Sequence, residues 1–95
     1  MERRKQIIFW IREILDKNLS DISYYAFIFG SQANKTFLRR LDVGIMADDK
    51  ISSQQLSTIN AAIEELPMLY NIDLVDFNDV GEQFKSVALR NIETL

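Results

Sequence analysis

The sequence predicts an α/β domain in which helices pack against one small β-sheet. Apolar residues recur at helical spacing in long segments, and short, continuous apolar runs lie between those segments. Helices interleaved with apolar strands are typical of a sheet covered by helices. The chain has 95 residues, 47% of them hydrophobic and 26% charged, so we expect a single domain over residues 1–95 with one modest core.

The apolar spacing assigns the elements. In chain order they are a helix over 3–17, a strand over 23–29, a helical turn and basic loop over 31–40, a strand over 41–46, a helix over 52–66, a strand over 70–77 and a last helix over about 81–92. In the first helix Ile7, Ile11 and Ile14 share one face, and charged residues fall mainly on the other. The run over 23–29 is aromatic and apolar, as in a buried strand.

The second half of the chain follows the same rules. Ser52 or Ser53 can cap the helix over 52–66, and Pro67 stops it. The runs over 41–46 and 70–77 are built mainly from branched and aromatic residues, which favour strands. The last helix is expected to turn four apolar residues inward, namely Phe84, Val87, Ala88 and Ile92.

Composition excludes several kinds of chemistry. The chain has no cysteine and no histidine, so acid–base or metal chemistry must come from carboxylates, lysine or tyrosine. The net charge of −3 argues against direct nucleic-acid binding, which normally requires a basic face. No apolar run is long enough for a signal peptide or a membrane span, and we expect a cytoplasmic protein.

Three polar features interrupt the predicted strands. Gly30-Ser31 follows the first strand, where it is either a plain strand-to-helix turn or a cradle for phosphate oxygens. Asp42 lies within the second strand, where it either faces solvent or joins a site. Asp73 and Asp76 lie in the third strand, three residues apart, so they point to opposite faces and at most one can meet Asp42. Carboxylates on adjacent strands can hold Mg²⁺, a hard cation that prefers oxygen ligands.

At these residues the sequence resembles the minimal nucleotidyltransferases of the DNA polymerase beta superfamily. The family motif is Gly-Ser, ten residues, then Asp-x-Asp, and a third carboxylate on a neighbouring strand. Here Gly30-Ser31 is followed by ten residues and then Asp42-Val43-Gly44, so that Asp42 matches the first aspartate and Gly44 takes the place of the second. Asp73 best matches the third carboxylate, with Asp76 the second candidate. The resemblance implies a palm-like fold with a small mixed sheet.

A second alignment is equally open. Leu41-Asp42-Val43-Gly44-Ile45 fits the end of the family segment Ser-Asp-Ile-Asp-Val-Gly-Ile if the preceding loop lacks two positions. Asp42 is then the second aspartate, and Arg40 replaces the first. In both alignments one carboxylate of the pair is absent. The loop before it carries Lys35, Arg39 and Arg40, which either contact a triphosphate or form a solvated surface.

The resemblance implies a function. Members transfer a nucleoside monophosphate with the help of Mg²⁺, and small free-standing members are often antitoxins of HEPN-domain toxins that add AMP to a toxin tyrosine. Transferred residue by residue, it implies that Gly30 and Ser31 hold the phosphates of ATP, that Arg40 contributes to nucleotide binding, and that Asp42 and Asp73 are the catalytic and metal-binding residues.

Two other hypotheses remain at this stage. The same fold, without catalysis, can neutralise or bind a partner by contact alone, or the chain can form a homo-oligomer. Phe9, Trp10 and Tyr70 are then candidate anchors, because aromatic residues are enriched in contact hot spots, although each can equally belong to the core. The last hypothesis is a small α/β domain that binds neither nucleotide nor toxin.

Overall fold

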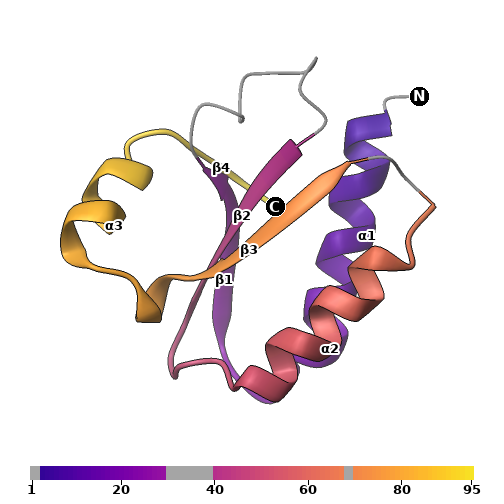
Figure 1. The fold of residues 1–95 in the computed structure, drawn as a ribbon, viewed down its shortest axis with the longest axis horizontal. Coiled ribbons are helices and arrows are strands. Elements are labelled where there is room, and N and C mark those ends of the chain that lie inside the picture. Colours follow the sequence, from indigo (N-terminus) through magenta and orange to yellow (C-terminus); the bar gives the residue numbers. More distant parts are fainter. Residues whose placement is uncertain (1–2, 30–39, 68–69) are drawn as a thin grey trace.

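The computed structural model describes residues 3–29, 40–67 and 70–95, and at Arg3 and Arg40 the backbone alone. In this part of the chain a β-sheet carries α1 and α2 on one face and α3 on the other (Figure 1). The elements in chain order are α1 (Arg3–Asn18), β1 (Tyr24–Phe29), β2 (Arg40–Ala47), α2 (Ser53–Glu64), β3 (Asn71–Asp76), the 3₁₀ turn η2 (Phe77–Asp79), α3 (Glu82–Ala88) and β4 (Ile92–Thr94).

The sheet is mixed, as the resemblance implied. The strand order is β3-β2-β1-β4, with β1 antiparallel to both β2 and β4 and with β2 parallel to β3. Two parallel strands cannot be joined by a tight turn, so the chain crosses from β2 to β3 through α2. Within the described residues, β3 therefore forms one edge of the sheet and β4 the other.

The larger apolar cluster lies between the sheet and the two long helices. Ile7, Ile11 and Leu15 of α1 are fully buried against it, which confirms the predicted apolar face of the first helix. Every second residue of β2 belongs to the same cluster, namely Leu41, Val43 and Ile45. Because side chains alternate along a strand, the even-numbered positions of β2 belong to the opposite face of the sheet.

That opposite face carries a smaller, aromatic cluster. Phe27 and Phe77 pack edge to face with ring centroids 5.0 Å apart, and Phe29 meets Phe77 at 5.2 Å. Phe84 of α3 lies 6.0 Å from Phe29, and Ala88 is buried beside the rings. The helix α3 is therefore held on the sheet by aromatic contacts at its inner side.

The predicted start of the second long helix is confirmed in detail. The Ser52 hydroxyl accepts a hydrogen bond from the Gln55 backbone N–H at 3.0 Å, and the Gln55 side chain accepts one from the Ser52 backbone N–H. This reciprocal capping box satisfies two of the donors that a helix start leaves without partners. Ser52, and not Ser53, is the cap, and α2 ends at Glu64, before Pro67.

The predicted helix over 81–92 is wrong in its second half. The helix α3 ends at Ala88, and Ile92–Thr94 forms β4, paired with Phe27–Phe29 of β1. Of the four residues expected to point inward, Ala88 is buried and Ile92 packs against the aromatic cluster from β4. Phe84 contacts the rings of Phe29 and Phe77 but stays 47% exposed, and Val87 is 56% exposed. The strand hydrogen bonds that β4 makes to the open edge of β1 outweigh the local helical pattern, which a sequence window cannot register.

Candidate functional site

The two predicted site aspartates lie side by side on the sheet. Asp42 of β2 and Asp73 of β3 are direct partners in the parallel ladder. Neighbouring strands run about 4.8 Å apart, and partners in a parallel pair project from the same face. Asp42 is half-buried and Asp73 is exposed, on the face away from α1 and α2. Both carboxylates therefore belong to one surface that a ligand can reach.

The other carboxylate of β3 has a different task. Asp76 is buried, with one carboxylate oxygen accepting from the Ile51 backbone N–H at 3.0 Å and the other from the Asn78 backbone N–H at 3.0 Å. These bonds tie the end of β3 to the start of the α2 segment and cap η2. Of the two candidates for the third carboxylate, Asp73 alone shares a face with Asp42.

Gly44 is a packing position between aromatic rings. It is buried, and a Cβ atom built on it would lie 2.5 Å from Phe77 Cε1 and 2.6 Å from Phe27 Cε2, closer than real Cβ contacts come. A carboxylate at position 44 would have to displace these rings. The packing therefore favours the alignment in which Gly44 matches the glycine of Asp-Val-Gly-Ile, Asp42 is the second aspartate and Arg40 stands at the first.

The remaining predicted site residues are Gly30, Ser31 and Arg40. Gly30 and Ser31 fall outside the described residues, as does the loop with Lys35 and Arg39. The chain leaves β1 at Phe29, directly after the strand pair Ile28–Val43, so it departs at the level of Asp42. Arg40 is the first residue of β2, and its backbone is paired with Asn71.

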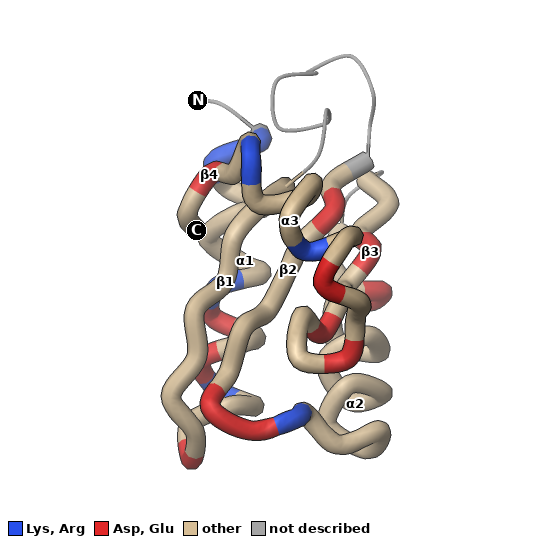
Figure 2. Tube along the Cα trace, turned by 90° about the vertical axis from the view of Figure 1, so that its left-hand side faces the viewer, with Lys and Arg blue, Asp and Glu red and all other residues tan. Residues whose placement is uncertain are grey.

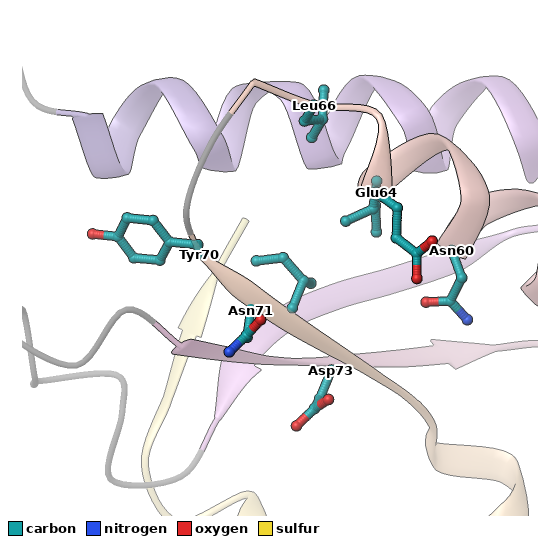
Figure 3. Close-up of a pocket in the computed structure, with 8 residues that line it drawn as sticks. Asn60, Glu64, Leu66, Tyr70, Asn71 and Asp73 are labelled. Atoms are coloured by element: carbon teal, nitrogen blue, oxygen red, sulfur yellow. The ribbon is translucent and has the colours of Figure 1, made fainter.

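A pocket of about 480 Å³ runs beside the carboxylate pair, along the open edge of β3. Figure 3 shows Asn71 and Asp73 on one side of the β3 ribbon, with Asn60 and Glu64 reaching in from α2 on the other. The sequence analysis did not single out Asn60 or Glu64, because both lie on the exposed polar face of α2 and carry no motif. Only the crossover from β2 to β3 brings them near Asp73.

The carboxylate pair fits one Mg²⁺ ion better than an all-protein metal cage. In residues 3–29, 40–67 and 70–95, no group of three or more acidic side chains could hold a metal. Mg²⁺ commonly binds through one or two carboxylates and takes its other ligands from water and substrate phosphates. Two in-register aspartates on an accessible face meet that requirement.

Tyrosine was one of the side chains left for acid–base chemistry, and Tyr24 is unsuited to it. Its hydroxyl donates a hydrogen bond to Asp16. Burial, and then this bond, raise the pKa of Tyr24 well above its usual 10.0. The phenol therefore stays protonated near neutral pH and serves to hold β1 against α1.

The three aromatic residues proposed as anchors differ in their exposure to solvent. Phe9 is 54% exposed on α1, whereas Trp10 and Tyr70 are half-buried and pack against the larger apolar cluster.

Across the three described segments, no helix is both long and apolar enough to cross a bilayer.

Two aspartates in register on the open face of a small mixed sheet are ligands of the kind through which Mg²⁺ binds phosphate groups. The polymerase beta nucleotidyltransferase family model matches residues 10–95. The chain therefore belongs to this family, and the resemblance noted from Gly30-Ser31, Asp42 and Asp73 is confirmed at the level of family and fold. A comparison with curated protein sequences finds no match.

Several solved structures share this fold, and some of them are toxin–antitoxin complexes. A crystal structure from Shewanella oneidensis superimposes with a TM-score of 0.73 at 17% identity, covering 99% of this chain and 71% of the other. A chain in the structure of a tri-AMPylated Shewanella oneidensis HEPN toxin with its MNT antitoxin gives 0.66 at 15%, covering 95% and 69%. A toxin–antitoxin structure with AMP-PNP gives 0.64 at 16%, covering 90% and 69%. At these identities the likeness establishes the fold.

Proposed function

We propose that this protein is the antitoxin of a HEPN toxin and that it transfers AMP from ATP to a tyrosine hydroxyl of that toxin. The observation that carries the proposal is the pairing of Asp42 with Asp73 on one accessible face of a nucleotidyltransferase sheet. Further support comes from the neighbours of the same fold, one with a tri-AMPylated toxin and one with AMP-PNP.

Each candidate residue has one role in this reaction. Gly30 and Ser31, where the chain leaves β1, hold the β and γ phosphates, and Asp42 would be a ligand of the Mg²⁺ ion. Asp73 accepts the proton of the tyrosine hydroxyl. The hydroxyl oxygen then bonds to the α phosphorus, the bond from that phosphorus to the bridging oxygen breaks, and pyrophosphate leaves.

Asp42 and Asp73 would hold the Mg²⁺ ion, which when bound offsets negative charge on the phosphates. The positive charge of Arg40, at the place of a family aspartate, would act on the same phosphates. A guanidinium pairs well with phosphate oxygens, so the basic side chain can replace part of the charge compensation that a second metal ion would give.

The test is transfer to the partner itself. The purified chain would be mixed with a HEPN-domain toxin, with ATP and Mg²⁺, and the intact mass of the toxin would be measured. We expect a mass increase of one or more AMP units on a tyrosine peptide, lost in Asp73→Asn. An unmodified partner that is nevertheless neutralised in a tight complex would overturn the transfer activity and leave inhibition by contact.

A further inference from the structure

The pocket beside the carboxylate pair is a groove with a strand edge as its floor. It runs along β3, between the carboxyl half of α2 on one side and Asn71 and Asp73 on the other (Figure 3). Ile63, Leu66 and Ile72 supply apolar contacts, and Asn60, Glu64 and Asn71 supply polar groups. A mixed lining of this kind can hold both the backbone and the alternating side chains of a bound segment.

The floor of the groove offers backbone hydrogen bonds. Within the described part of the chain β3 pairs with β2 alone, so the other side of β3 is the edge of the sheet. An edge strand presents a row of N–H and C=O groups, onto which an extended segment from another chain can add as a further strand. Asn71–Asp73 line the groove and the strand continues beyond it to Asp76, so a bound segment can pair with up to six residues of β3.

The charges of the groove select a basic occupant. Glu64 and Asp73 line it, and among the lining residues that the structure describes none is lysine or arginine. The carboxyl end of α2 points its negative dipole at the same place, with no basic residue in the last turn to offset it. Acidic positions also mark β3 and the segment after it in Figure 2.

We propose that this groove is the docking site for the acceptor: an extended, basic peptide segment of the partner protein that pairs with the open edge of β3. The inference rests on the proposed function for the identity of the acceptor, because the groove ends at Asp73, where the hydroxyl is to be activated. Strand pairing fixes the segment in register, and its lysine or arginine side chains meet Glu64.

Binding is tested without nucleotide or metal. The probe is a fluorescent peptide of about ten residues that alternates lysine with valine and carries one tyrosine, long enough to cover all six residues of β3. We expect saturable binding that weakens as salt rises, with amide NMR shifts in residues 71–75. Equal binding of the matched glutamate peptide, or amide shifts confined to other elements, would overturn the proposal.

Strand pairing also requires free N–H groups at alternate positions of the peptide backbone. Alternate N–H groups of an added strand face β3, so of two peptides N-methylated at odd or at even positions, only one should lose the pairing bonds. We expect a loss of at least about tenfold in affinity for that one, from the loss of two or three hydrogen bonds. Equal affinity of the two methylated peptides would rule out strand addition.

The charge contribution has a matched pair of variants. Glu64→Gln should weaken peptide binding about two- to fivefold, the usual range for one exposed ion pair. Glu65→Gln removes the same charge from the adjacent exposed residue, which does not line the groove, and should change nothing. An equal loss in both variants would mean that net charge, and not the groove, attracts the peptide.

Two outcomes separate this inference from the proposed function. Peptide binding without any ATP binding would support the groove and contradict AMP transfer. ATP binding without peptide binding would support the nucleotide site and contradict the docking groove. A dimer that forms through β3 and that excess peptide cannot dissociate would overturn the docking site, because a second copy of the chain would then occupy the edge.

Discussion

At the scale of single residues, position 44 shows how packing decides between two interpretations of one motif. Counting ten residues from Ser31 places Gly44 where the family has an aspartate. The rings of Phe27 and Phe77 lie where the Cβ atom of any larger residue would be. The aromatic cluster thus favours a glycine at position 44, and with it the alignment in which Arg40 stands at the first aspartate of the motif.

Substitution of Gly44 should therefore destabilise the fold. We expect Gly44→Ala to lower the free energy of unfolding by about 1–3 kcal/mol through overpacking, and Gly44→Asp to cost more because it buries a charge. Gly81→Ala is the control, since Gly81 is exposed and a Cβ there meets nothing within 4 Å. Urea unfolding measures both. Equal stability of Gly44→Ala and the parent would mean that the rings move aside easily.

Arg40→Asp should restore the missing ligand where Gly44→Asp cannot. In the alignment that the packing favours, position 40 holds the first aspartate of the pair, two residues before Asp42 on β2. A third carboxylate on this face should tighten Mg²⁺ binding at least about tenfold, since hard cations gain affinity with ligand charge. Calorimetric titration with MgCl₂ alone measures this affinity. Weaker Mg²⁺ binding in Arg40→Asp than in the parent would refute the alignment that places Arg40 at the first aspartate.

Asp73 and Asp76 should respond oppositely to the same substitution. Asp76→Asn weakens the bonds to the Ile51 and Asn78 backbone N–H groups, and we expect a loss of about 1–3 kcal/mol in stability with nucleotide affinity retained. Asp73→Asn should leave stability within about 0.5 kcal/mol, as is usual for exposed positions, and abolish Mg-dependent nucleotide binding. Thermal unfolding with and without Mg·ATP measures both the stability and the nucleotide binding of each variant. If Asp73→Asn lost stability and Asp76→Asn lost nucleotide binding, the roles of the two residues would have to be exchanged.

At the scale of elements, one ion pair ties the first helix to the last strand. Arg4 of α1 donates two hydrogen bonds to the Glu93 carboxylate of β4, at 2.6 and 2.9 Å. These bonds hold the pKa of Glu93 below its usual 4.5, against the opposing effect of burial. A depressed folded-state pKa means that the stabilisation is present above pH 4.5 and is lost as the pH falls through the folded value.

Glu93→Gln should therefore flatten the acid side of the stability profile. The Glu93 side chain is 42% exposed, so solvent screening keeps the effect small, below about 1 kcal/mol at neutral pH. Glu82→Gln is the control, because the Glu82 side chain is 91% exposed in its contact with Lys85. Urea midpoints measured between pH 7 and pH 3 give the comparison. A profile unchanged in Glu93→Gln would contradict the assigned role.

The elements also mark where sequence reasoning succeeds and where it ends. The two long helices and three strands were predicted because their apolar periodicity is strong, and the Ser52 cap because its local chemistry is complete. The strand Ile92–Thr94 was missed because three residues carry no periodicity and its stability comes from pairing with β1. The groove beside β3 escaped notice for the same reason, since Asn60 and Asp73 meet only in the folded chain.

At the scale of the whole molecule, the sheet order converts a dispersed motif into one surface. The aspartates are 31 residues apart in sequence, and the parallel pairing of β2 with β3 makes them neighbours. The strand β1 ends at Phe29, level with Asp42, and the groove along β3 reaches Asp73. The sequence motif indicated the family and the candidate residues, whereas the common face, the separate role of Asp76 and the groove beside β3 come from the fold.

Binding of a nucleotide with Mg²⁺ at the Asp42–Asp73 face can be measured by calorimetric titration with ATP. The parent chain, Asp42→Asn and Asp73→Asn would each be titrated with and without MgCl₂, alongside Asp49→Asn as an exposed control. We expect Mg-dependent ATP binding by the parent and by Asp49→Asn, and loss of this binding in both site variants. Binding that survives in both site variants, or a parent that binds no ATP, would contradict this expectation.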